Sequence, residues 1–243
     1  MSGQTGRRAV VTGAAGGIGA AVAARLAADG ADVLVTDLDG EGAEKVAAGI
    51  GARAARLDVT DPAAVHRLLG TQPFDVLVNN AGHDDFGWFT DVEPARWRRV
   101  LAVNLEGVLA CTQAVLPGMQ RAGYGRIVTV TSEAGRIGSK GNAVYAAAKA
   151  AVTGFSKSIA RENARYAITV NCVAPGPTDT AMVAAIRDTG GERVVAAMVA
   201  GTQLGRLGTP DEIAAAVAFL ASPAASYITA ETLGVSGGMG IGG

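Results

Sequence analysis

The sequence predicts a doubly wound α/β fold, in which a parallel sheet of about seven strands carries helices on both faces. Two observations lead to this prediction. Short runs rich in β-branched residues alternate with longer alanine-rich helical patterns almost from end to end, and the strand-like runs are nearly continuously apolar. Such strands are typical of parallel sheets that helical crossovers cover on both faces.

Seven runs have the pattern of strands. In chain order they are RAVVTG (8 to 13), DVLVTD (32 to 37), RAARLDV (53 to 59), FDVLVNNAG (74 to 82), RIVTVTS (126 to 132), AITVNCVAPG (167 to 176) and a last run near ITAETLGVSGG (228 to 238). The stretches between them are helical, and two begin with clear start signals, at Asp61 before Pro62 and at Thr209 before Pro210. This Rossmann-like order places ligands beyond the carboxyl ends of the strands.

The chain has 243 residues, 49% of them hydrophobic, which is enough for one large domain over residues 1 to 243. We find no internal repeat, linker or charge run that marks a second domain. The segment from about 180 to 202 interrupts the alternation and reads as one or two short inserted helices. We expect this segment to form a lid over the substrate.

Charge and cysteine content exclude several classes of function. The 21 basic and 22 acidic residues give a net charge of -1, so we expect a small-molecule substrate and neither nucleic acid nor an anionic membrane as partner. Cys111 and Cys172 have no metal-site or disulfide spacing, so we expect buried free thiols and no metal. No apolar segment precedes the first strand and no run approaches the roughly 18 residues of a membrane span, which predicts a cytoplasmic protein.

A glycine-rich turn follows the first predicted strand. TGAAGGIG (12 to 19) places Gly13, Gly17 and Gly19 where that strand meets a helix. Glycines let the backbone approach a pyrophosphate, whose charge the N-terminus of the helix binds. The spacing GxxxGxG departs from the common GxGxxG, and close packing alone is the alternative explanation.

Asp37 ends the second predicted strand, where a carboxylate accepts hydrogen bonds from an adenosine ribose and repels a 2′-phosphate. This favours NAD over NADP as cofactor. No Arg or Lys occupies the glycine-rich turn or the two positions after Asp37, so a 2′-phosphate is expected to lack a nearby partner. A helix cap is the alternative role for Asp37.

The stretch VYAAAK places Tyr145 and Lys149 four residues apart, on one face of a predicted helix. Only small side chains lie between them. Either the helix packs closely against a neighbour, or a phenol is held beside an ammonium for chemistry.

Together these motifs resemble the short-chain dehydrogenase/reductase family over essentially the whole chain. NNAG (79 to 82) and PGPTDT (175 to 180) match two further motifs of that family. The resemblance implies a homotetramer built through about 94 to 122 and 143 to 166, and it implies four catalytic residues: Asn104, Ser132, Tyr145 and Lys149. It also implies cofactor contacts at Gly13, Ala15, Gly17, Ile18, Gly19, Asp37, Leu38, Asp58, Val59, Asn80, Gly82, Tyr145, Lys149, Pro175, Gly176, Thr178 and Thr180.

The mechanism that the resemblance implies assigns a role to each of the four. Tyr145 exchanges a proton with the substrate oxygen while hydride moves between the substrate carbon and the nicotinamide. Lys149 and the charge of oxidised nicotinamide lower the pKa of the phenol. Ser132 holds the substrate oxygen, and Asn104 anchors a water. Each residue also has a purely structural alternative, and a non-catalytic NAD-binding module is the competing class of function.

The predicted substrate is a β-hydroxyacyl or β-ketoacyl thioester. The loop HDDFGWF (83 to 89) resembles the branch with 2-hydroxycyclohexanecarboxyl-CoA dehydrogenase and 3-oxoacyl thioester reductases. Residues expected at the substrate are His83, Glu133, Asn142 and Met182. A carboxylate at Glu133 beside Ser132 would disfavour an anionic group, so a tailoring ketoreductase that acts on a polar or amine-bearing ketone is the alternative.

Overall fold

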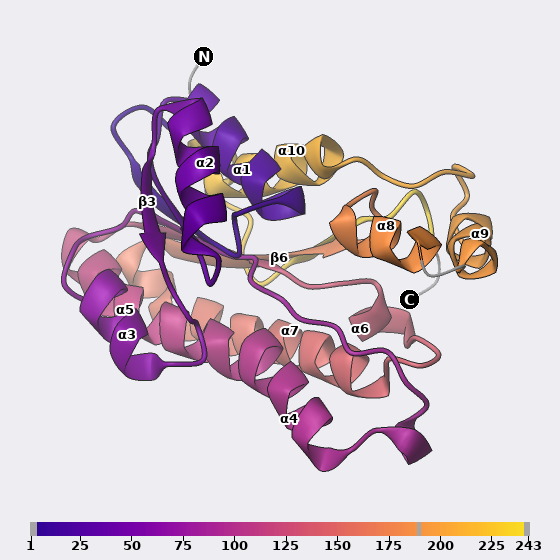
Figure 1. The fold of residues 1–243 in the computed structure, drawn as a ribbon. Helices are drawn as coiled ribbons and strands as arrows, with labels where there is room; N and C mark the ends of the chain where they lie inside the picture. The colour runs from indigo at the N-terminus through magenta and orange to yellow at the C-terminus, as the bar shows by residue number, and fades with distance from the viewer. Residues whose placement is uncertain (1–3, 189–190, 241–243) are drawn as a thin grey trace.

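The computed structural model describes residues 4–188 and 191–240 of the chain. Seven strands form one parallel sheet in the order β3-β2-β1-β4-β5-β6-β7 (Figure 1). The strands are β1 (Arg8–Thr12), β2 (Asp32–Asp37), β3 (Arg53–Arg56), β4 (Val76–Asn79), β5 (Gly125–Val130), β6 (Ile168–Pro175) and β7 (Thr232–Val235). Each of the seven predicted runs coincides with one of them, with β5 beginning one residue before its run, so the predicted fold class is confirmed.

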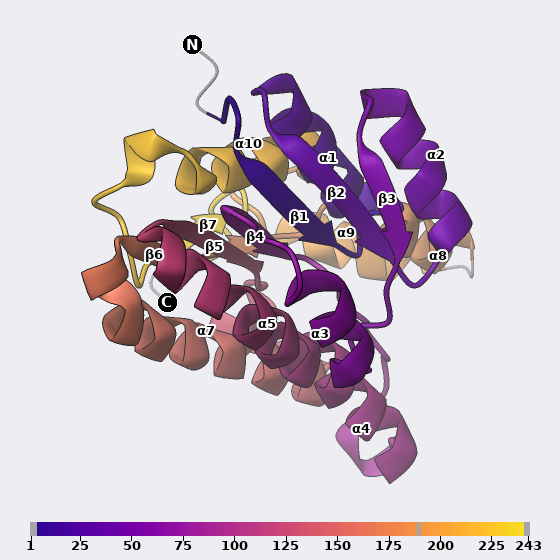
Figure 2. The same cartoon turned by 90° about the vertical axis from the view of Figure 1, so that its left-hand side faces the viewer.

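Helices cover both faces of the sheet. Figure 2 shows α1, α2 and α10 on one side of the strands and α3, α5 and α7 on the other. The helices are α1 (Gly17–Ala28), α2 (Gly40–Ile50), α3 (Pro62–Leu69), α4 (Pro94–Leu101), α5 (Gly107–Ala122), α6 (Ala134–Ile137), α7 (Ala143–Asn163), α8 (Ala181–Asp188), α9 (Glu192–Ala200) and α10 (Pro210–Ala221).

Alternate residues of the strands feed two separate cores. In β1, Val11 points into the core beneath α1, α2 and α10, and Val10 into the core beneath α3, α5 and α7. The inner strands β4, β5 and β6 are buried along their whole length, as expected for a sheet covered on both faces, whereas the edge strands β3 and β7 are partly exposed. Cys111 and Cys172 lie buried in the structure as free thiols, as predicted.

The helix start signals are confirmed in the structure. Asp61 Oδ1 accepts hydrogen bonds from the backbone N–H groups of Ala63 and Ala64 at the start of α3. Thr209 forms a capping box with Glu212 at the start of α10. These caps fix where two crossover helices begin, and therefore where the loops beyond the strands run.

The predicted lid contains two short helices, α8 and α9, which lie together at one end of the molecule in Figure 1. Its role as a lid stays a prediction.

The helical run Pro94–Ala122 is apolar and long enough to cross a membrane by length and composition, contrary to the expectation that no run approaches that length. Its α5 portion contributes Cys111, Val115 and Met119 to the core, so it serves here as a core helix.

Candidate active site

Three of the four predicted catalytic residues, Asn104, Tyr145 and Lys149, lie around the loop that follows strand β4. A Cβ built on Gly82 would lie 3.1 Å from Asn104 Oδ1 and 3.6 Å from Lys149 Nζ, so the backbone of NNAG passes between these two side chains. Lys149 Nζ also lies 5.5 Å from the centroid of the Tyr145 ring. The structure thus brings together groups from β4, α7 and the helical run after α4.

Asn104 lies in a π-helical turn, Ala102–Glu106, that joins α4 to α5. It is fully buried, and its Nδ2 donates to His83 O at 2.6 Å and to Val100 O at 2.9 Å. Its Oδ1 accepts from the His83 backbone N–H at 3.3 Å. Such one-turn π bulges are frequent at functional sites, and this one fixes the loop that follows β4.

Ser132 and Tyr145 meet beyond the end of β5. Tyr145 lies in the first turn of α7, and Ser132 hydrogen-bonds to it. Desolvation by burial and then the negative charge of Asp84 raise the pKa of Tyr145 to about 12, against the lowering effect of the Ser132 hydrogen bond. The groups of the protein itself therefore favour the protonated phenol.

Lys149 is buried, at 4% exposure, and its Nζ donates to Val130 O at 3.0 Å. Burial lowers the pKa of Lys149 to about 8. The ammonium is directed to the β5 carbonyl and lies below the tyrosine ring. Burial, Asp84 and Ser132 set the pKa of Tyr145 here, and the lowering of this pKa by Lys149 together with oxidised nicotinamide stays a prediction.

The glycine-rich turn leads from β1 into α1 and fits a dinucleotide. Gly13 has a φ of +64°, and a Cβ there would lie 2.6 Å from Ala81 Cα, so only glycine fits. Asn80 Nδ2 donates to Gly13 O at 2.7 Å and ties this turn to β4. No side chain caps the first turn of α1, and a Cβ on Gly16 would meet no atom within 4 Å. The helix N-terminus therefore faces open space that suits a pyrophosphate.

Asp37 lies at the end of β2, beside this turn. Its Oδ2 accepts from Ala15 N at 2.9 Å and its Oδ1 accepts from Asp39 N at 3.0 Å. Arg56, from the neighbouring β3, donates its Nε to Leu38 O at 3.1 Å. The prediction that no cation lies near Asp37 is therefore wrong, because the sheet brings Arg56 to residues that follow it.

The remaining predicted cofactor residues surround the same edge of the sheet. Asp58 accepts from Thr60 Oγ1 at 2.7 Å, and this hydrogen bond lowers the pKa of Asp58. Val59 packs against Gly107 at the start of α5. After β6, Thr178 Oγ1 donates to Gly176 O at 3.0 Å, and the methyl group of Thr180 lies over Gly17. The 175 to 180 segment is thus beside the glycine-rich turn.

Glu133 lies on the side of the C-terminal strand, and its predicted contact with substrate stays a prediction. Its carboxylate is 1% exposed and accepts from Arg136 Nη1 at 3.1 Å. It also lies against Gly234 and Gly240, on the side of the C-terminal strand. The strand-end backbone turns this side chain away, because Glu133 N donates to Pro175 O at the end of β6.

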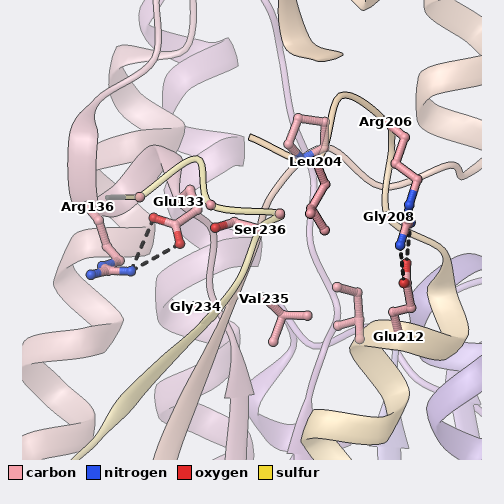
Figure 3. A pocket seen from close by; sticks show the side chains of 14 residues that line it. Glu133, Arg136, Leu204, Arg206, Gly208, Glu212, Gly234, Val235 and Ser236 are labelled. Atoms are coloured by element: carbon pink, nitrogen blue, oxygen red, sulfur yellow. Dashed lines mark hydrogen bonds and ion pairs between the residues drawn. The ribbon is translucent and has the colours of Figure 1, made fainter. Parts of the chain in front are cut away.

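Glu133 lines a cavity of about 470 Å³ that Figure 3 shows from close by. The Glu133–Arg136 ion pair lies on one side of it, and the Arg206–Glu212 ion pair lies on the other. None of the four predicted catalytic residues is among the lining residues that the structure describes. Arg136 pairs with the Glu133 carboxylate, and the expectation that Glu133 disfavours an anionic substrate group stays a prediction.

Of the other predicted substrate residues, Asn142 lies closest in sequence to Tyr145. Asn142 Nδ2 donates to Asp84 Oδ2 at 2.8 Å. His83 is bound through its backbone to Asn104, and Met182 is in α8, with its side chain outside what the structure describes. Asp84 itself was missed in the sequence, although it belongs to the loop that was expected to flank the pocket.

Comparisons with known proteins agree with this arrangement. A family model described as Enoyl-(Acyl carrier protein) reductase matches residues 13–240. The chain belongs to the short-chain dehydrogenase/reductase family. Membership makes the protein an oxidoreductase, and it confirms the resemblance that the motifs predicted.

Relatives within this short-chain dehydrogenase/reductase family cover nearly the whole chain. The 3-oxoacyl-[acyl-carrier-protein] reductase FabG of Escherichia coli K12 is 44% identical over 241 residues, which are 96% of this chain and 97% of that protein. Nodulation protein G of Rhizobium sp. N33 is 42% identical over 97% of both chains. A crystal structure described as ribose-5-phosphate isomerase from Brucella melitensis 16M superimposes with a TM-score of 0.92 at 35% identity, covering 98% of this chain and 93% of that chain.

Proposed function

We propose that this protein reduces a 3-oxoacyl thioester to the 3-hydroxyacyl thioester with NADH, and that Tyr145 donates the proton. The observation that carries the proposal is the contact of Tyr145 with Ser132 beside Lys149 and Asn104. The named activity of the Escherichia coli and Salmonella relatives supports the substrate class.

The pKa of Tyr145 supports the reductive direction. Reduction of a ketone needs an acid that delivers a proton to the oxygen as it becomes an alkoxide. A phenol whose pKa is raised to about 12 is protonated over the physiological pH range and begins the reaction as that acid. Ser132 holds the substrate oxygen, and Lys149, with a pKa lowered to about 8, returns a proton to the phenol.

The cofactor we propose is NADH, which supplies the hydride. Gly13 to Gly19 and the N-terminus of α1 would hold the pyrophosphate, and Asp37 would accept from the adenosine ribose. Both carboxylate oxygens of Asp37 already accept backbone hydrogen bonds, which hold the charge in place against a 2′-phosphate. The segment around Thr178 and Thr180 would meet the nicotinamide.

Assembly into a homotetramer is part of the proposal. Phe86, Trp88 and Phe89 are more than 60% exposed, and a cavity of about 350 Å³ is lined by apolar residues of α4, α7 and the loop before them. Exposed apolar surface of this kind suits a second copy of the chain. A molar mass of four chains in light scattering is the expected result.

Tyr145→Phe tests the proposal most directly. With acetoacetyl-CoA and acetoacetyl carrier protein as substrates, the wild type should oxidise NADH at a measurable rate in absorbance assays. The variant should lose about 10²- to 10⁴-fold in kcat because the proton donor is removed. Its binding of NADH, followed by fluorescence, should stay unchanged.

Tyr227→Phe is the matched control, because this tyrosine is fully exposed on the surface. It should keep the wild-type rate. A Tyr145→Phe variant with near wild-type turnover contradicts the assigned acid, and absence of turnover with both thioesters contradicts the substrate class. Equal kcat/KM for NADH and NADPH in the same assay contradicts the role of Asp37.

A further inference from the structure

Asp84 is a carboxylate near Tyr145 that the proposed mechanism leaves without a role. It follows the NNAG motif by two residues, and its charge acts on both Tyr145 and Lys149. Its one side-chain hydrogen bond links it to Asn142, the residue from which α7 begins, at 2.8 Å. Asp84 is therefore tied to Asn142, which lines a cavity together with Tyr145, and its charge reaches the phenol.

The second oxygen of Asp84 lacks a well-formed hydrogen bond. Asp84 Oδ1 is buried, and no described residue donates to it within hydrogen-bond geometry. Asn142 Oδ1 is buried in the same way. None of the ion pairs among the described residues includes Asp84, whereas its neighbour Asp85 binds Arg96 at 2.8 Å. Each of the two hydrogen-bonded residues thus has one buried acceptor oxygen without a well-formed hydrogen bond, although the backbone N–H of Asp85 also acts on the Asp84 carboxylate and lowers its pKa.

An unsatisfied buried acceptor costs free energy, so such groups are normally matched by a ligand or by water. The pKa of Asp84 is raised, chiefly by burial, which is the direction expected when a carboxylate lacks a cation. Asn142 holds the carboxylate in one orientation by its single hydrogen bond. The arrangement is that of an acceptor site kept in place for a donor.

We propose that Asp84 and Asn142 form a specificity-determining pair that accepts a hydrogen bond from a hydroxyl or ammonium group of the substrate, near the reacting carbonyl. This inference rests on the proposed reduction and narrows its substrate class to donor-bearing ketones. Within that class, substrates with a carboxylate at the same position are repelled by Asp84.

The test compares ketones that differ only in the donor. Hydroxyacetone and methoxyacetone form one matched pair, and N-methylacetoacetamide and N,N-dimethylacetoacetamide form another, with acetoacetyl-CoA as reference. The wild type should prefer the donor-bearing member of at least one pair by about 10- to 100-fold in kcat/KM, because a hydrogen bond to a charged group is lost in the other member. Asp84→Asn should reduce this preference to less than about threefold.

Asp85→Asn is the control, because the carboxylate of this neighbouring residue is already paired with Arg96. It should keep the wild-type preference. Equal kcat/KM for both members of both pairs in the wild type overturns the inference, and this measurement needs no variant. An Asp84→Asn change that lowers kcat/KM equally for every substrate also overturns it, because it shows only an electrostatic effect on Tyr145.

The outcomes separate this inference from the proposed function. Reduction of acetoacetyl-CoA without any donor preference contradicts the role of Asp84 alone. Reduction of donor-bearing ketones with no turnover of the thioester contradicts the thioester substrate and supports the role of Asp84.

Discussion

Asp84, which is half-buried, and Glu133, which is buried, are two carboxylates beyond the ends of the strands, and they differ in their partners. Glu133 accepts two hydrogen bonds from Arg136, at 3.1 and 3.3 Å, on the side of the C-terminal strand. Asp84 forms no ion pair among the described residues and accepts from the neutral Asn142 on the side of Tyr145. Glu133 therefore has a cationic partner within the protein, whereas Asp84 has none among the described ion pairs.

The largest change in the free energy of unfolding is expected at Lys149. Like Asp84, it is a charged group that forms none of the described ion pairs, and it is buried. Its folded pKa of about 8 lies below its ordinary value of 10.5, so burying the charge costs roughly 3 kcal/mol at pH 7. This penalty is complete below pH 8 and disappears as pH rises to about 10.5. Lys149→Met should therefore be inactive yet more stable than the wild type at pH 7, by about 2 kcal/mol after the lost hydrogen bond.

Urea unfolding between pH 7 and pH 10.5 measures this effect. The stability of the wild type should rise relative to Lys149→Met as pH increases. A constant difference between the two proteins across that range would show that folding does not shift the pKa of Lys149, and it would contradict the burial penalty.

A smaller effect is expected at Glu133. Glu133→Ala removes the buried partner of Arg136 and should lower the free energy of unfolding by about 2 kcal/mol, less than for a fully buried pair because Arg136 reaches solvent. Asp84→Ala, which breaks no ion pair, should change stability much less. Thermal unfolding of the two variants side by side checks the contrast, and equal losses would break the comparison.

The smallest effect is expected at Arg206, whose ion pair with Glu212 faces the same cavity as Glu133. Both side chains of this pair are largely exposed, and Arg206 lowers the pKa of Glu212 to about 2. Arg206→Ala should destabilise the protein less than Glu133→Ala, because water screens exposed pairs. The loss should vanish in 1 M salt, whereas that of Glu133→Ala should persist.

The sequence predicted the fold and the closeness of Tyr145 and Lys149, because both depend on local patterns. Continuous apolar strands and helix caps such as Thr209 define the elements, and their alternation defines the order of a parallel sheet. The position of Tyr145 relative to Lys149 follows from helical spacing alone. Belonging to the short-chain dehydrogenase/reductase family was also predictable, because its motifs recur in order.

Side-chain direction and long-range partners were not predictable in the same way. Glu133 follows Ser132 directly, yet adjacent residues after a strand point to opposite sides. Asp84 meets Asn142 across 58 residues of sequence, and Arg56 reaches Leu38 only because β3 pairs with β2. The pKa of Lys149 depends on burial, which no spacing of residues reveals.

The π-helical turn that contains Asn104 has a consequence for how this enzyme can diversify. The side-chain amide of Asn104 forms two hydrogen bonds with the backbone of His83 and none of these involves the side chain of His83. Exchanging the amino acids of the following loop therefore leaves the reacting groups in register. New substrate preferences can be selected there while the chemical step is inherited intact.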